Sequence, residues 1–285
     1  MTEKKLPKKL LIYSSIDKYC VDVILKNRFV VTDPTKGFND PLDCYFEFEF
    51  AGLNKERLVE QLMGIFISKK GKILSDLTRN DHDKINYENN KLNSLSEDIL
   101  KKELSDYSTK IVRESLSNFL RIRCFSALNE KKTLNNVIFS HYGDSHKGLC
   151  YIFDQKKLIP IQDRKSLTEV KYCFKPASVE FKDQYSQEDL DQIGRDMIGI
   201  KHHDWGYENE WRLKAEAEFP NKIYETMGFP PNALEGIVLG IKATKKDKER
   251  IIKLVEKRTA KVKVFQASRI FGSFELEYEN NPIFE

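Results

Sequence analysis

The chain has 285 residues, of which 40% are hydrophobic and 32% charged, and its 48 basic and 44 acidic side chains give a net charge of +4. This composition excludes general disorder, and the mixed charges form no basic stripe that would by itself indicate a nucleic-acid partner. No apolar run approaches the roughly 20 residues that span a bilayer, and the apolar stretch after the basic N-terminus is too short for a signal peptide. We therefore expect a cytoplasmic protein without membrane contact, whose five dispersed cysteines are reduced thiols.

The first forty residues alternate strands, a helix and turn residues. The apolar run at residues 10–14 predicts a strand, and Asp17 is expected to cap the helix that follows it. Residues 29–31 predict a second strand, which an Asp-Pro pair ends. Residues 37–43 then combine Gly, Asn, Asp and Pro, which is typical of a turn.

Two amphipathic helices are predicted next, separated by a polar segment. Apolar residues recur with a helical period over residues 54–68 and again over residues 97–118. Residues 69–96 are rich in Lys, Asn and Asp and have few apolar anchors, so we interpret them as a solvated, mobile insertion. Because no Gly/Ser linker or internal repeat is visible, we expect residues 1–285 to form a single domain.

The second half of the chain is rich in predicted strands. Strands are predicted at residues 119–125, 137–139, 149–153, 170–174, 178–181, 211–219, 236–241, 262–265 and 274–278, and helices at residues 187–200 and 245–257. Since strands outnumber helices and neither class is segregated, the fold class is predicted as α+β. We expect a mixed, mostly antiparallel sheet with flanking helices.

Polar residues interrupt the apolar pattern in three places, and the first of them lies near the N-terminus. Tyr13 and Ser14 end the first strand, and Asn39 and Asp40 lie in the turn at residues 37–43. This turn is interpreted either as a rigid loop that presents an amide and a carboxylate to a ligand, or as a turn whose side chains bind their own backbone.

The second polar cluster is Phe139-Ser-His-Tyr-Gly-Asp-Ser-His-Lys-Gly148, predicted to connect two strands. It forms either the wall of a site, with Ser140 and Tyr142 beside His141, or a polar hairpin that satisfies buried backbone groups. His141 could accept or donate a proton near neutral pH. The spacing of His141 and His146 is not a standard zinc pattern, and we expect no metal.

The third cluster is Lys201-His-His-Asp-Trp-Gly-Tyr-Glu-Asn-Glu-Trp-Arg212. If the strand already begins at Glu208, the side chains of Glu208, Glu210 and Arg212 project from one face. The alternative is the ordinary solvated face of an antiparallel strand. Both tryptophans of the chain lie here, which favours a fixed geometry.

The Glu-x-Glu pair that opens a strand is similar to that of NAD-dependent ADP-ribosyltransferases, although the same spacing recurs by chance elsewhere in this chain of 44 acidic residues. This resemblance implies an ADP-ribosyltransferase-like architecture and NAD as the substrate. Glu210 would stabilise the oxocarbenium-like transition state, with Glu208 acting on the acceptor. The resemblance also assigns Tyr13, Ser140 and Tyr142 to the nicotinamide wall and Lys201 or Arg212 to the pyrophosphate. The acceptor would be a nucleic acid or a protein.

Two other functions remain open at this point. A nuclease or phosphodiesterase could use His141 and His146 as acid and base, or could bind a divalent ion through His141, Asp144 and Glu210. A non-catalytic sensor could use the same residues to bind a nucleotide or a protein partner.

Four segments together carry a family resemblance: residues 37–43, 120–126, 139–150 and 201–213. As a set they resemble a bacterial family catalogued as domain-of-unknown-function family 2971. The central motif of that family usually reads Trp-Ser-His-Tyr-Ala, whereas Phe139 and Gly143 replace the Trp and the Ala here. The family often occurs beside mobile or defence-related genes, and this implies a toxin or an antiviral defence protein.

Overall fold

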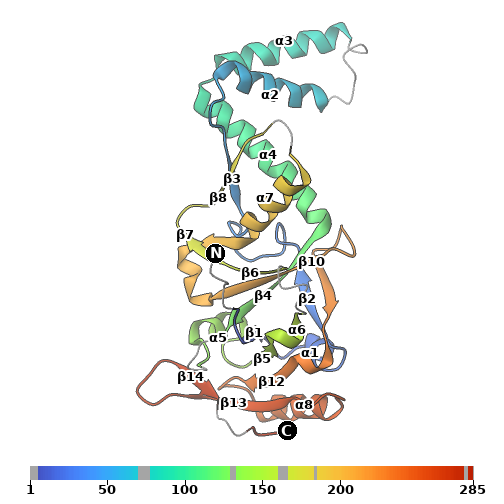
Figure 1. Cartoon of the computed structure of the whole chain (residues 1–285), viewed down its shortest axis with the longest axis vertical. Helices are drawn as coiled ribbons and strands as arrows, with labels where there is room; N and C mark the ends of the chain where they lie inside the picture. The colour runs from blue at the N-terminus through green and yellow to red at the C-terminus, as the bar shows by residue number, and fades with distance from the viewer. Residues whose placement is uncertain are drawn as a thin grey trace. The chain divides into compact units, whose positions relative to one another are not determined.

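The computed structural model describes residues 6–69, 78–128, 133–159, 166–182, 185–278 and 282–284 (Figure 1). Its contacts divide the chain into two compact units. The first unit contains Met1–Cys44, Ser117–Lys175 and Ile198–Glu285, and the second contains Tyr45–Leu116 and Pro176–Met197. The expectation of one domain over the whole chain stays a prediction.

Within its described residues, the first unit contains a ten-stranded, mostly antiparallel sheet. Neighbouring strands follow the order β11 (Tyr224–Gly228), β2 (Arg28–Thr32), β4 (Leu120–Ala127), β1 (Lys9–Ser14), β5 (Leu149–Asp154), β12 (Leu234–Leu239), β13 (Lys263–Arg269) and β14 (Leu276–Tyr278). Strand β10 (Glu210–Glu216) pairs with β4 and with β6 (Leu167–Glu169), while β7 (Lys171–Cys173) and β9 (Ile200–His202) form a separate parallel pair. In the large sheet β12 and β13 run parallel, so the predicted α+β class with a mixed sheet is confirmed.

The two faces of this sheet are covered by different helices. On one face, alternate strand residues such as Tyr151 and Phe153 pack with α1 (Tyr19–Ile24), α6 (Gln155–Leu158) and α8 (Lys245–Glu256). On the other face, strand residues such as Cys150 pack with the apolar side chains of α5 (Asn136–Tyr142). Because side chains alternate along a strand, the sheet has two apolar faces and is buried on both.

Strand β4 has two different partners along one of its edges. Strand β10 occupies the other edge from Leu120 to Ser126. On the first edge, β2 pairs at Ile122 and β1 pairs from Ser126 onward. Among the described residues, positions 123–125 of β4 pair on this edge with neither strand. The strands β1 and β2 therefore diverge beside the middle of β4.

The second unit is mainly helical. It contains α2 (Lys55–Ser68), α3 (Arg79–Ser94), most of α4 (Glu97–Phe119) and of α7 (Gln187–Gly199), and the parallel pair of β3 (Phe46–Glu49) and β8 (Ala177–Glu180). Part of the insertion predicted at residues 69–96 forms α3, which begins at a capping box between Thr78 and Asp81. Residues 70–77 of that insertion lie outside the described residues, and its mobility stays a prediction.

One predicted strand of the second polar cluster is wrong. Residues 137–139 belong to helix α5, because the side chain of Asn135 accepts hydrogen bonds from the backbone N–H groups of Val137 (2.9 Å) and Ile138 (3.0 Å). The β-branched residues there favour a strand locally, but the N-cap and the burial of Ile138 and Phe139 against the sheet decide the helix. Ser140 therefore lies on a helix, and the second polar cluster connects a helix to a strand. The helices predicted at residues 97–118 and 245–257 are confirmed by α4 (Glu97–Phe119) and α8 (Lys245–Glu256).

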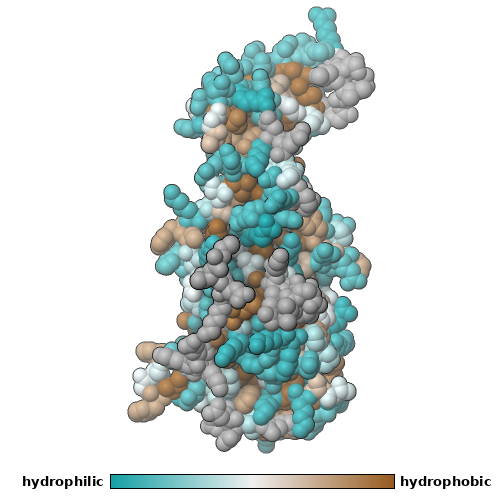
Figure 2. Space-filling model, viewed as in Figure 1, coloured by the Kyte–Doolittle hydropathy of each residue, from teal (hydrophilic) through white to brown (hydrophobic). Residues whose placement is uncertain are grey.

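No helix among the described residues is both long and apolar enough to cross a membrane. The face of the molecule in Figure 2 is covered mostly by hydrophilic side chains, with small scattered apolar areas. This surface agrees with a chain in which 32% of the residues are charged.

Gly148, the last residue of the second polar cluster, is predicted to tolerate no side chain. A Cβ atom at this position would lie 2.1 Å from the backbone oxygen of Ser14 and 2.8 Å from that of Gly143. We expect Gly148→Ala to lower the free energy of unfolding by about 1–3 kcal/mol. Gly228→Ala is the control, since its Cβ would meet nothing closer than 4.0 Å. Urea denaturation of both variants measures the difference, and equal stabilities would contradict this packing.

Candidate functional site

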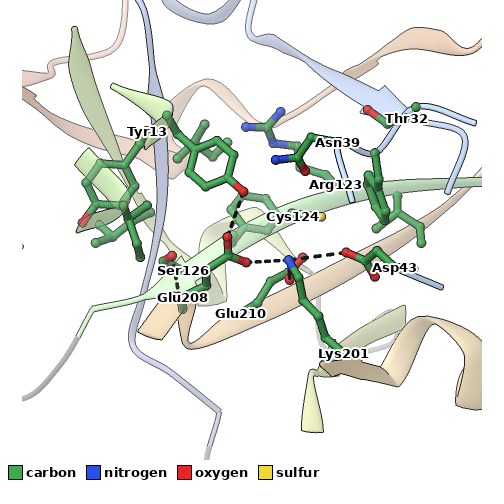
Figure 3. Close-up of a pocket in the computed structure, with 18 residues that line it drawn as sticks. Tyr13, Thr32, Asn39, Asp43, Arg123, Cys124, Ser126, Lys201, Glu208 and Glu210 are labelled. Atoms are coloured by element: carbon green, nitrogen blue, oxygen red, sulfur yellow. Dashed lines mark hydrogen bonds and ion pairs between the residues drawn. The ribbon is translucent and has the colours of Figure 1, made fainter. Parts of the chain in front are cut away.

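A cavity of about 370 Å³ lies in the first unit, where β1 and β2 diverge (Figure 3). Its wall includes Tyr13 from β1, Ile122–Ser126 from β4 and Tyr142 from α5. The turn at residues 37–43 contributes further wall residues. The size lies within the range of about 300–1,000 Å³ that is usual for small-molecule sites.

Lys201, on β9, is surrounded by three carboxylates in this cavity. Its Nζ lies 2.6 Å from Glu208 Oε2, 3.1 Å from Glu210 Oε2 and 3.4 Å from Asp43 Oδ2. The Trp205 ring lies beside the same ammonium group, 4.9 Å from Nζ to the ring centroid. All four charged side chains are buried, so their positions are fixed by one another rather than by solvent.

Arg212, on β10, forms ion pairs with two of these carboxylates, Asp43 and Glu210, and does not itself line the cavity. Its Nη2 donates to both carboxylate oxygens of Asp43 at 2.8 Å, and its Nε donates to Glu210 Oε1 at 2.9 Å. The remaining terminal nitrogen donates to the backbone oxygen of Ile198 and to Cys44 Sγ, each at 3.1 Å. The guanidinium is fully buried, and its planar donors match this set of acceptors.

The backbone before β10 positions the two glutamates differently. Residues His203–Glu208 form the 3₁₀ helix η3, and Asn209 follows in the left-handed conformation with φ 45°. The strand begins at Glu210, so the condition that it already begins at Glu208 is not met. Both carboxylates still contact Lys201. Ser126 Oγ donates to the backbone oxygen of Glu208 at 2.7 Å and holds the turn.

The two glutamates have oppositely shifted pKa values. Burial is the largest influence on Glu208 and raises its pKa, although Lys201 acts against it. Burial also opposes ionisation of Glu210, but Arg212 and Lys201 outweigh it and lower the pKa of Glu210 to about 2. Paired carboxylates with divergent pKa values are typical of acid–base sites, with the higher one exchanging the proton. Of the two glutamates, Glu208 is therefore the one that burial shifts toward the protonated form.

Three tyrosine hydroxyls form hydrogen bonds near the glutamates, and that of Tyr142 binds a carboxylate. The Tyr142 hydroxyl donates to Glu208 Oε1 at 2.8 Å, and burial followed by the nearby Glu208 charge raises the pKa of this phenol. The Tyr172 hydroxyl accepts a hydrogen bond from the backbone N–H of Glu210 at 2.8 Å. The Tyr13 hydroxyl accepts from the backbone N–H of Asn135 at 3.2 Å, so it links β1 to the start of α5.

Most of the residues predicted for the site are brought together. Those that line the cavity are Tyr13, Asn39, Tyr142, Lys201, Glu208 and Glu210, with Arg212 directly behind them. Glu210 is only 4% exposed, so it is not on a solvated strand face.

Like Arg212, four further predicted residues do not line the cavity. Ser14 Oγ donates to the backbone oxygen of Ser15, and Asp40 Oδ1 accepts from the backbone of Leu42, which is the turn interpretation of that loop. Ser140 is exposed, and His141 is exposed with its Nδ1 at 3.2 Å from the Tyr207 hydroxyl. The catalytic role of His141 stays a prediction.

Several cavity residues were not predicted from the sequence, among them the polar or charged side chains of Asp43, Arg123, Cys124 and Ser126. A signal for some of them was present, because the predicted strand at residues 119–125 carries two arginines in an otherwise apolar run. Among the described residues, no group of three or more His, Cys, Asp or Glu side chains is placed to hold a metal ion.

A second cavity, of about 290 Å³, shares part of its wall with the first. Glu208, Tyr13 and Ser126 line both cavities. The second cavity is otherwise lined by residues such as Asn135 and Tyr207. The Glu208 carboxyl group therefore lies at the junction of two spaces.

The comparisons with known proteins agree with the resemblance expected from the motifs. Residues 138–213 match the family model DUF2971, a protein of unknown function. This segment runs from helix α5 to β10 and contains both glutamates, Lys201 and Tyr142. A search of curated proteins found no match, and neither did a search of solved structures.

Removal of the buried arginine is predicted to destabilise the first unit strongly. Arg212→Met leaves Asp43 and Glu210 buried without their main cation, and we expect it to lower the free energy of unfolding by about 3–5 kcal/mol. Lys214→Met is the matched control, because Lys214 lies two residues further on the same strand and is exposed. Chemical denaturation measures both variants, and similar losses would show that Arg212 does not hold the carboxylates.

Acid is predicted to weaken the fold through Glu210. Because its pKa is lower in the folded protein than the ordinary value of 4.5, Glu210 stabilises the fold above pH 4.5, and this stabilisation is lost as the pH falls toward about 2. Glu210→Gln cannot ionise, so the slope of stability against pH should flatten in that window. The exposed Glu216→Gln serves as the control and should keep the slope of the native protein. An unchanged slope in Glu210→Gln would contradict the assignment.

Proposed function

We propose that this chain is an enzyme that cleaves the nicotinamide–ribose bond of NAD and transfers or releases ADP-ribose. The observation that carries the proposal is the carboxylate pair of Glu208 and Glu210, fixed by one lysine at the wall of a ligand-sized cavity. The cellular role we propose is that of a cytoplasmic bacterial toxin or antiviral defence protein.

The chemistry follows from the charges around the cavity. As the C–N bond to nicotinamide breaks, its electron pair leaves with the nicotinamide, and positive charge develops on the ribose. Three buried carboxylates against the two cations Lys201 and Arg212 leave an excess of negative charge beside that sugar. A preorganised negative group lowers the barrier to such a transition state. Glu210, which stays ionised, would supply a negative charge that is present throughout the reaction.

Glu208 would act on the second reactant. The acceptor, which is water or a hydroxyl or amine of another molecule, forms the new bond to the ribose carbon and loses a proton. Burial raises the pKa of Glu208 above its ordinary value, which makes its carboxylate a stronger proton acceptor, and Glu208 lines both cavities. The donor would therefore occupy the first cavity and the acceptor the second.

The aromatic and amide groups of the first cavity suit a nicotinamide ring. Tyr13, Phe38 and Tyr142 line it together with the side-chain amide of Asn39. Aromatic rings can stack on the nicotinamide, and an amide can pair with its carboxamide. The Phe139-to-Gly148 cluster contributes Tyr142 to this wall, while Ser140 lies outside it.

The test is release of nicotinamide from NAD, measured with the pure protein and again with added nucleic acid or cell lysate. We expect Glu210→Gln and Glu208→Gln each to reduce turnover about 10²–10⁴-fold, since each removes a charge or a proton acceptor from the reaction. Glu216→Gln, exposed on the same strand as Glu210, should keep full activity. Thermal unfolding of all three variants separates lost chemistry from lost structure.

Absence of nicotinamide release under every condition would contradict the proposal. If a nucleotide then binds and is recovered unchanged, the site would be that of a sensor. Activity equal to the native protein in Glu208→Gln would show instead that the acceptor is activated elsewhere.

A further inference from the structure

Three arginines on the paired strands β4 and β10 point into the protein, and they differ in their partners. Arg121 Nε lies 2.8 Å from Glu225 Oε1, and its terminal nitrogens donate to backbone oxygens, among them that of Phe219 at 2.9 Å. Arg212 is held by Asp43 and Glu210. Both side chains are fully buried and both are neutralised by carboxylates. In both cases a carboxylate partner compensates the cost of burying the charge of the arginine.

Arg123 lacks such a partner. Its Nη1 donates to the backbone oxygen of Val30 at 3.1 Å, and its guanidinium lies 5.9 Å from the centre of the Phe29 ring. Among the described residues no carboxylate lies within ion-pair distance of it, and its buried Nε has no hydrogen-bond partner. Burial lowers the pKa of Arg123, as expected for a desolvated cation without an anion. The charge is thus left uncompensated.

The place of Arg123 in the sheet explains how a ligand could reach it. Residues 123–125 of β4 are the positions beside which β1 and β2 diverge, and Arg123 lines the cavity there. Figure 3 shows Arg123 apart from Lys201, Asp43 and Glu210. Alternation along β4 places the Arg123 side chain on the face of Leu213, opposite to that of Arg212 and Glu210. The cavity therefore has excess negative charge in the carboxylate cluster and a positive charge at Arg123, on the other side of β4.

We infer that Arg123 binds the phosphate of a nucleotide substrate, an inference that rests on the proposed function. The guanidinium has the geometry to pair with phosphate oxygens; its Nη1 donates to the backbone oxygen of Val30, while its Nε has no hydrogen-bond partner. Lys201 and Arg212 are not available for this, because their donors are taken by carboxylates. A substrate with a cationic ring and a nearby phosphate matches a cavity polarised in this way.

The inference predicts an effect of replacing Arg123 on the unfolding temperature that differs from the effect expected for an arginine with a purely structural role. Replacing an unpaired buried charge by an apolar side chain of similar length removes a desolvation cost. We therefore expect Arg123→Met, beside the Phe29 ring, to unfold at the same temperature as the native protein or a higher one. Arg121→Met is the matched control on the same strand and should be clearly less stable, since it leaves the buried Glu225 without its paired cation.

Binding measurements test the inference directly. Isothermal titration of the native protein and of Arg123→Met would use ADP-ribose, inorganic pyrophosphate and the phosphate-free nicotinamide riboside. We expect Arg123→Met to bind ADP-ribose about 10–100-fold more weakly, the value of one or two charged hydrogen bonds, and to bind the riboside unchanged. Arg123→Lys keeps the charge and should recover part of the affinity.

The outcomes separate this inference from the proposed function. Equal affinity of the native protein and Arg123→Met for ADP-ribose would overturn the inference, even if NAD is cleaved. Weakening for the riboside as much as for ADP-ribose would also overturn it, because the effect would not concern phosphate. If pyrophosphate binds through Arg123 but NAD is never cleaved, the inference stands and the proposed function is wrong. A native protein that binds neither phosphate compound overturns the inference.

Discussion

The site depends on two buried cations that hold three carboxylates together. Lys201 and Arg212 come from different strands, and each contacts both Asp43 and Glu210. Without them the carboxylates would repel one another and could not be buried. The same ion pairs join the turn at residues 37–43 to β9 and β10, so the electrostatic network is also what closes one wall of the cavity. Stability and the proposed chemistry therefore rest on the same contacts.

The sheet supplies the space in which this network can act. Where β1 and β2 diverge beside β4, no strand among the described residues pairs with the middle of β4 on that edge. A continuous sheet would have filled this position with a strand, and the carboxylates would face packed side chains. Here Tyr13, Cys124 and Glu210 face the cavity instead. One break in strand pairing thus converts a packed sheet face into a wall that a ligand can reach.

Much of the fold could be predicted from periodicity, whereas the partners in the site could not. The helical spacing of residues 97–118 and the alternation from Trp211 were sufficient, because both patterns are local. The strand predicted at residues 137–139 failed because a capping asparagine outweighed β-branched side chains. Asp43 and Arg123 were missed for another reason. What distinguishes them is the presence or absence of a counter-charge from a distant segment, and no local pattern records it.

The left-handed residue between the two glutamates has a wider consequence. Asn209 adopts φ 45°, and it alone separates the end of η3 from the start of β10. Asparagine tolerates this conformation, whereas a β-branched residue would resist it and displace Glu208 while Glu210 stays fixed in the sheet. A related chain could therefore retain every charged group and still be inert. Whether a relative can carry out the proposed chemistry should therefore be judged from the backbone at this position as well as from the acidic pair.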